Sequence, residues 1–147
     1  MKRFSFRLER LLQLRERAER TQAAELGAAM RAEEDQRAAL ERAREALERA
    51  AERGSAEPFT VGTMRTRELA REAMSQRVEV EQEALDLATG RRAEEQSLWQ
   101  DRRRDRRSVE KLKEKRFDAW REDASRDEQK TIDGLAQNRR PDEEAAG

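Results

Sequence analysis

Apolar residues recur at every third or fourth position over most of this chain, and arginine, glutamate and alanine fill the positions between them. From Phe4 the repeat follows steps of four and three residues, which is the seam pattern of a coiled coil. Two consecutive four-residue steps through Gln22 shift the phase, and such an insertion unwinds a supercoil locally without ending the helix. The pattern predicts a first helix over residues 5–53, with Ser5 as its N-cap. Its expected seam positions are Phe4, Leu8, Leu11, Arg15, Ala18, Gln22, Leu26, Ala29, Glu33, Gln36, Leu40, Ala43, Leu47 and Ala50.

The same spacing returns later and predicts a second long helix over residues 63–135. Its expected seam positions are Leu69, Met74, Val78, Glu81, Leu85, Ala88, Arg92, Leu98, Val109, Leu112 and either Ala119 or Trp120. Ala73 and Val80 fall off this seam, so they form either a second face for a partner or the edge of a broad apolar stripe.

The two prolines of the chain stand where the two helices are expected to stop. Pro58 lies in a predicted hinge, residues 54–62, which begins and ends with glycine. Pro141 lies in residues 138–147, which we expect to form a disordered acidic tail. Residues 1–137 are therefore predicted to form a single all-α domain, a long antiparallel two-helix coiled coil.

Folding the chain back about residue 58 predicts which residues face each other. The second helix is longer than the first, so we expect it to overhang from about Lys115. In that arrangement the overhang exposes Phe117 and Trp120, or these two rings pack on Phe4 and Phe6 as an end-cap. The expected facing pairs are Leu47 with Leu69, Ala18 with Leu98, and Phe4 with Leu112.

Composition narrows the fold class further. Charged residues make up 45% of the chain, and 23 of the apolar residues are alanine, which leaves too few large side chains for a globular core. High charge and low hydrophobicity also fit disorder. However, the net charge is zero and the two signs alternate along an alanine-rich chain, which favours helix.

The sequence lacks the residues and loops that several classes of function require. Cysteine and histidine are absent, so disulfides, the usual zinc sites and Ser-His or Cys-His catalysis are excluded. Neither a calcium-binding loop nor a phosphate-binding glycine loop occurs. We therefore expect a protein that is not an enzyme, with no catalytic residues, cofactor or metal. With no apolar run of membrane-spanning length and a charged N-terminus, it is expected in the cytoplasm.

One charged segment is a candidate binding surface. Residues 101–121 contain ten basic and five acidic residues, including Arg106 and Arg107. Such a run is most often a solvated helix face, and docking of an acidic partner is the second possibility. Nucleic acid is disfavoured because the whole chain is neutral and no aromatic residues alternate with the arginines.

Two sequence segments resemble the FliJ family, the small coiled-coil proteins of flagellar type III export. The first is Phe4-x-Phe6-x-Leu8-x-x-Leu11-Leu12 followed by Leu14-Arg15. The second is Arg126-Asp127-Glu128-Gln129-Lys130-x-Ile132-Asp133. The chain has Gly134 where the family's segment continues with acidic residues, so the second helix is expected to end early, at about residue 135.

The resemblance implies an antiparallel coiled coil without catalytic activity, similar to the stalk of rotary ATPases. The implied partners are the hexameric flagellar export ATPase, the cytoplasmic domain of the export gate and the export chaperones, at the cytoplasmic side of the inner membrane. Phe4, Phe6, Arg106, Arg107, Phe117 and Trp120 are the expected ATPase contacts, and Ala73 and Val80 the expected gate or chaperone contacts. The alternatives are a self-associating scaffold coiled coil and the stalk protein of a virulence-type injectisome.

Overall fold

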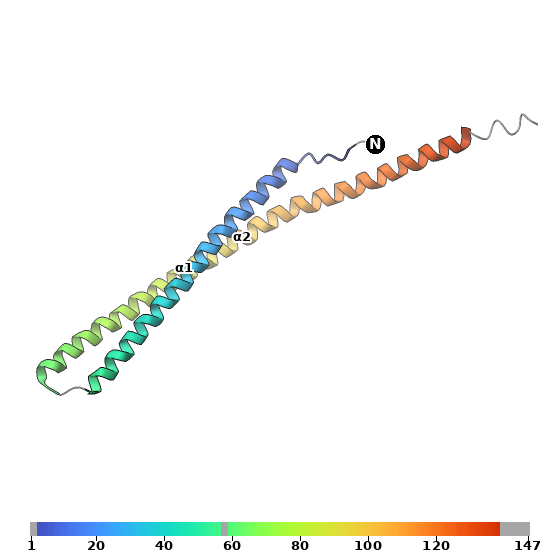
Figure 1. The fold of residues 1–147 in the computed structure, drawn as a ribbon. Helices are drawn as coiled ribbons and strands as arrows, with labels where there is room; N and C mark the ends of the chain where they lie inside the picture. Colours follow the sequence, from blue (N-terminus) through green and yellow to red (C-terminus); the bar gives the residue numbers. More distant parts are fainter. Residues whose placement is uncertain (1–2, 57–58, 139–147) are drawn as a thin grey trace, which may run out of the picture. The chain divides into compact units, whose positions relative to one another are not determined.

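The computed structural model describes residues 3–56 and 59–138 and contains two helices (Figure 1). Helix α1 spans Glu9–Ala56 and helix α2 spans Val61–Asn138; within the described ranges there is no strand. The helices contribute to two compact units, one of residues 1–17 with 103–147 and the other of residues 18–102. In each unit α1 and α2 run antiparallel, which confirms the predicted all-α two-helix coiled coil.

Helix α1 begins four residues later than predicted. Ser5 is exposed and precedes the helix, whose first turn is closed by the amide of Glu9 donating to the carbonyl of Phe6 at 3.1 Å. Phe4 and Phe6, on either side of Ser5, are both half-buried. Burial of these aromatic side chains outweighs the local preference of serine for an N-cap.

The link between the helices is shorter than the predicted hinge. Helix α1 continues through Gly54 to Ala56, close to the point at which Pro58 disfavours helix for the preceding residue. Helix α2 begins two residues earlier than predicted because Thr60 caps it. The amide of Thr63 donates to the Thr60 hydroxyl at 3.2 Å, and the amide of Thr60 donates to the Thr63 hydroxyl at 3.0 Å.

Helix α2 runs through Gly134 and continues past the predicted end at residue 135 to Asn138. A single glycine costs a helix only about 1 kcal/mol relative to alanine, which the flanking turns tolerate. The rest of the predicted tail, residues 139–147, lies outside the described residues. No described helix is long and apolar enough to cross a membrane.

The seam of residues 18–102 is narrow and partly polar. Ala29 and Leu40 are its buried apolar residues, and both occupy predicted seam positions. Glu33 and Glu81, also predicted seam positions, are only 8% exposed. Glu33 lies 3.4 Å from Arg92 of α2 and accepts a hydrogen bond from Thr89 at 3.3 Å. The carboxylates are therefore buried together with donors rather than alone.

The predicted seam assignment of three leucines on α2 is wrong. Leu69, Leu98 and Leu112 are 61%, 47% and 37% exposed. The adjacent residues Trp99 and Lys113 are half-buried in place of the last two. The three leucines share one face of α2, which lies about 60–140° around the helix from Glu81, Glu95 and Lys113, the residues that bond to α1.

Candidate partner-binding surfaces

An aromatic cluster joins the N-terminal segment to α2. The ring of Phe4 meets Phe117 edge-on, with centroids 5.2 Å apart and an interplanar angle of 85°. Trp120 lies 5.8 Å from Phe4 and 5.7 Å from Phe117. These are favourable aromatic geometries. Of the two arrangements expected from sequence, the end-cap is therefore present for Phe4, and the overhang of α2 starts after Trp120 rather than at Lys115.

Two ion pairs between α1 and α2 hold this part of the coiled coil in register. Glu9 lies 2.8 Å from Lys113, and Arg15 lies 2.8 Å from Asp105. All four side chains are partly exposed, so each pair contributes at most about 1 kcal/mol. The pairs matter more for the alignment of the two helices than for stability. In this alignment Phe4 lies over Phe117 and Trp120 instead of over Leu112.

The two predicted arginines of this unit have different surroundings. Arg106 is 20% exposed and bonds Glu110 on the next turn of α2 at 2.6 Å. Arg107 is exposed. Phe6 is half-buried. The predicted set therefore divides into the contacting rings of Phe4, Phe117 and Trp120 and the exposed cation of Arg107, with Arg106 held by its own helix.

Ala73 and Val80 lie in the other unit, and both are exposed on α2. At 3.6 residues per turn they share one face of the helix with Leu69, Leu87 and Leu98, within about 40° of rotation. Val80 is 59% exposed and Leu87 is 76% exposed. We call these five residues the outer stripe. Leu69 and Leu98 had been assigned to the seam. Leu87 was missed from sequence, although it follows Val80 by the same seven residues that separate Val80 from Ala73.

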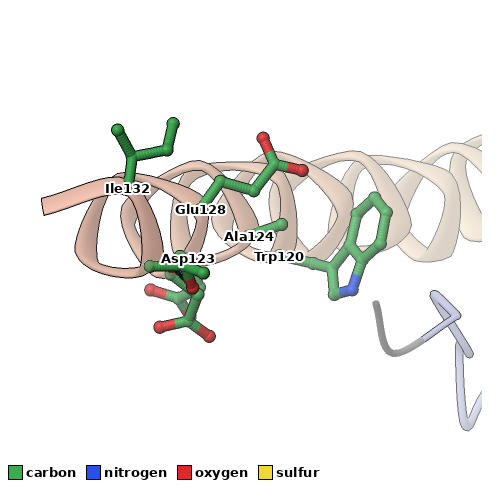
Figure 2. Close-up of a pocket in the computed structure, with 7 residues that line it drawn as sticks. Trp120, Asp123, Ala124, Glu128 and Ile132 are labelled. Atoms are coloured by element: carbon green, nitrogen blue, oxygen red, sulfur yellow. Dashed lines mark hydrogen bonds between the residues drawn. The ribbon is translucent and has the colours of Figure 1, made fainter. Parts of the chain in front are cut away.

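The part of α2 beyond Trp120 carries a third surface. From Arg121 to Ala136 every side chain is exposed except Ala124, which is half-buried. A hollow on this stretch is lined by Trp120, Asp123, Ala124, Asp127, Glu128, Thr131 and Ile132. Figure 2 shows Trp120 beside the N-terminal segment, with Asp123 and Glu128 projecting on different sides of the helix. Sequence reasoning noted this stretch only as an overhang and as part of a family motif.

The arrangement offers several candidate surfaces for binding a partner. Within the described ranges, no group of three or more acidic side chains is placed to hold a metal ion. The candidate surfaces are an aromatic cluster, a basic helix face, the outer stripe and the hollow at the end of α2. Aromatic residues and arginine of this kind dominate the energetics of protein interfaces.

Comparison with known proteins identifies the family. Neither the curated proteins nor the solved structures gave a significant match. A family model described as flagellar FliJ protein matches residues 4–141, which is nearly the whole chain and includes all four surfaces. The chain therefore belongs to the FliJ family, and membership of that family implies a component of the flagellar type III export system.

Proposed function

We propose that this chain is a non-enzymatic component of the flagellar export apparatus that contacts the hexameric export ATPase through its N-terminal segment and the adjoining part of α2. The observation that supports the proposal is the aromatic cluster of Phe4, Phe117 and Trp120, in a chain matched to the FliJ family over residues 4–141. The contact would place the protein at the cytoplasmic side of the inner membrane when the apparatus is assembled.

The geometry of the cluster supports a partner contact in two ways. Phe117 keeps 39% of its surface exposed although it touches Phe4, so part of the ring is available. Arg107, ten residues earlier on the same helix, adds an exposed cation that can meet an acidic surface. Together with Phe6 and Arg106 these residues form the proposed ATPase contact.

The decisive experiment measures ATP hydrolysis by the cognate export ATPase with catalytic amounts of this protein. We expect stimulation by the wild type and its loss in the Phe117→Ala/Trp120→Ala variant. Arg107→Glu should weaken stimulation. Lys115→Glu, a charge reversal at an exposed position about 140–160° around α2 from both rings, is the matched control. Circular dichroism verifies that the helices remain. Full stimulation by the double variant would remove the aromatic cluster from the contact.

A second contact is proposed for the outer stripe, Leu69, Ala73, Val80, Leu87 and Leu98. Its residues repeat at coiled-coil spacing but face away from α1, which suits a second helical or apolar partner. We assign it to the cytoplasmic domain of the export gate, with the export chaperones as the alternative occupant. Ala73→Glu/Val80→Glu should abolish binding of the gate fragment. The matched control is Ala93→Glu/Ser97→Glu, which adds the same charge on another exposed face.

The rival for the outer stripe is self-association of this chain, because an apolar stripe also suits a second copy. Sedimentation of the purified protein separates these cases. A dimer that dissociates in the Ala73→Glu/Val80→Glu variant would favour the scaffold function over the gate contact. Retained gate binding by that same variant would show that the stripe is only exposed helix surface.

A further inference from the structure

The seam of α2 continues past the point where its intramolecular partner stops. Val109, Lys113 and Trp120 are half-buried where the start of the chain packs on α2. The same four-and-seven-residue spacing then leads to Ala124, Thr131 and Leu135. At 1.5 Å per residue, Trp120 to Leu135 covers about 22 Å, or about four helical turns. We call this stretch, whose first residue Trp120 is contacted by Phe4, the free seam.

The apolar side chains of the free seam are arranged as they would be if a second helix packed on them. Trp120, Ala124 and Ile132 are among the residues that line the hollow (Figure 2). Ile132 and Leu135 are 60% and 64% exposed. Because these side chains extend the stripe that buries Phe4, the covering element they fit best is another helix in line with α1.

The charge of α2 changes sign where the free seam begins. Residues 103–117 contain eight basic and three acidic residues, whereas residues 121–136 contain three basic and five acidic residues. Three of these acids line the hollow, and by helical rotation Asp123 and Asp127 lie on one side of the free seam and Glu128 on the other. An occupant of this surface therefore meets carboxylates on both flanks.

The existing ion pairs leave these carboxylates open to an incoming cation. Asp123 lies 3.7 Å from Arg126, and Asp127 lies 3.8 Å from Lys130. Both pairs are longer than a hydrogen bond, and their side chains are 70% to 80% exposed, so they are weak. In the described part of the chain Glu128 makes no ion pair. Lysine or arginine on a partner can displace these contacts at little cost.

We propose that the free seam, from Trp120 to Leu135, binds a basic amphipathic helix of another protein. That helix continues the coiled coil beyond the N-terminal end of α1. Apolar side chains of that helix pack on Trp120, Ala124 and Leu135. Lysine or arginine at its flanking positions meets Asp123, Asp127 and Glu128, as flanking charges do in coiled coils. This contact shares Trp120 with the proposed ATPase contact, while its other residues lie outside both the ATPase and the gate contacts.

The test uses two synthetic helical peptides with the same leucine seam, one flanked by lysine and one by glutamate, and the full-length protein. In a Trp99→Phe background Trp120 is the remaining tryptophan, so its emission reports docking in the hollow. Peptide anisotropy gives the affinity. We expect the lysine peptide to bind, to shift the Trp120 emission and to bind at least about tenfold more tightly than the glutamate peptide.

Charge-reversal variants of equal net charge separate docking at this face from general attraction. Asp127→Arg/Glu128→Arg should reverse the preference in favour of the glutamate peptide. Glu122→Arg/Asp133→Arg makes the same change on the opposite face of α2 and should leave the preference for lysine intact. Each pair of substitutions removes one exposed ion pair, so the variants are matched in that respect as well.

Three results would overturn the proposal. Equal binding of both peptides by the wild type would show that the acidic flanks do not select the occupant. Equal loss of lysine-peptide binding in both charge-reversal variants would show that net charge, and not a defined face of α2, attracts the peptide. A wild-type dimer that Asp127→Arg/Glu128→Arg dissociates in sedimentation would make a second copy the occupant. ATPase stimulation, measured in parallel, distinguishes these results from a failure of the proposed ATPase contact.

Discussion

The side-chain amide of Gln36 on α1 donates a hydrogen bond to the carboxylate of Glu81 on α2, whose side chain is almost buried. The same amide reaches the Glu81 backbone carbonyl at 3.5 Å. Gln22 repeats both contacts with Glu95, two heptads away along each helix. A polar pair repeated in phase fits only one alignment of the helices, so it selects the register of the coiled coil.

This repeat predicts opposite effects for single and double substitution. Gln36→Leu removes a donor from the buried carboxylate of Glu81, which keeps only its 2.7 Å bond from Arg77 among the contacts described here, and should destabilise the protein by about 1–3 kcal/mol. Gln36→Leu/Glu81→Leu should recover that stability or exceed it, because an apolar pair replaces a buried polar one. Denaturant unfolding followed by circular dichroism measures both. A double variant less stable than the single one would contradict the explanation.

The gain of the double variant should come with a loss of specificity. Without its polar pair the seam accepts other alignments and a second chain, so sedimentation should detect dimers that the wild type does not form at the same concentration. Leu40→Ile, a substitution within the buried apolar seam, is the control and should stay in the wild-type oligomeric state. If the double variant also keeps that state, the polar pairs do not select the register.

Periodicity alone was sufficient for the fold and for most of the first-helix seam. Ala29, Glu33 and Leu40 were placed by spacing, and spacing places charged residues as well as apolar ones. It failed on α2 at Leu98 and Leu112, because a helix with two apolar stripes offers leucines to either face. Choosing leucine in each case selected the residue next to the half-buried one, Trp99 or Lys113. The interhelical bonds that decide the register depend on side-chain geometry, which spacing does not contain.

The candidate surfaces were predictable to different degrees. The aromatic cluster could be named from sequence, but whether Phe4 covers Trp120 depends on a register shift of one to two turns. The outer stripe was found only at Ala73 and Val80, because Leu98 had been assigned to the seam. The free seam requires knowing where the cover by the N-terminal segment stops. That point is fixed by the aromatic contacts of Phe4, not by the start of the helix.

A charge swap tests whether the ion pair between Glu9 and Lys113 helps to set this alignment. Lys113→Glu places two carboxylates together and should lower the free energy of unfolding by about 0.5–1 kcal/mol. Glu9→Lys/Lys113→Glu should restore it, because the pair is rebuilt with its signs exchanged. Thermal unfolding at low salt measures the difference, which should shrink at high salt. No recovery in the double variant would indicate that the pair contributes nothing to register.

We expect Gly27 to be a mildly destabilising residue within α1, not a position at which the two helices approach closely. A Cβ built at this position has no atom within 4 Å outside its own helix, and the same is true of Gly90 in α2. Gly27→Ala and Gly90→Ala should each stabilise the protein by about 1 kcal/mol, since alanine loses less backbone entropy on forming a helix. Denaturant midpoints give the values. Destabilisation by either substitution would mean that the two helices approach more closely there than the structure shows.

The aromatic cluster predicts that Phe4 controls the environment of Trp120. Phe4→Ala removes the ring that meets both Phe117 and Trp120 and should cost about 0.5–1.5 kcal/mol beyond the lost burial. In a Trp99→Phe background the emission of Trp120 should move to longer wavelength and become more accessible to acrylamide. Phe4→Leu should lie between the wild type and alanine, because it keeps apolar contact but not the edge-to-face geometry. Unchanged quenching in Phe4→Ala would show that the N-terminal segment does not cover Trp120 in solution, and the free seam would then begin before that residue.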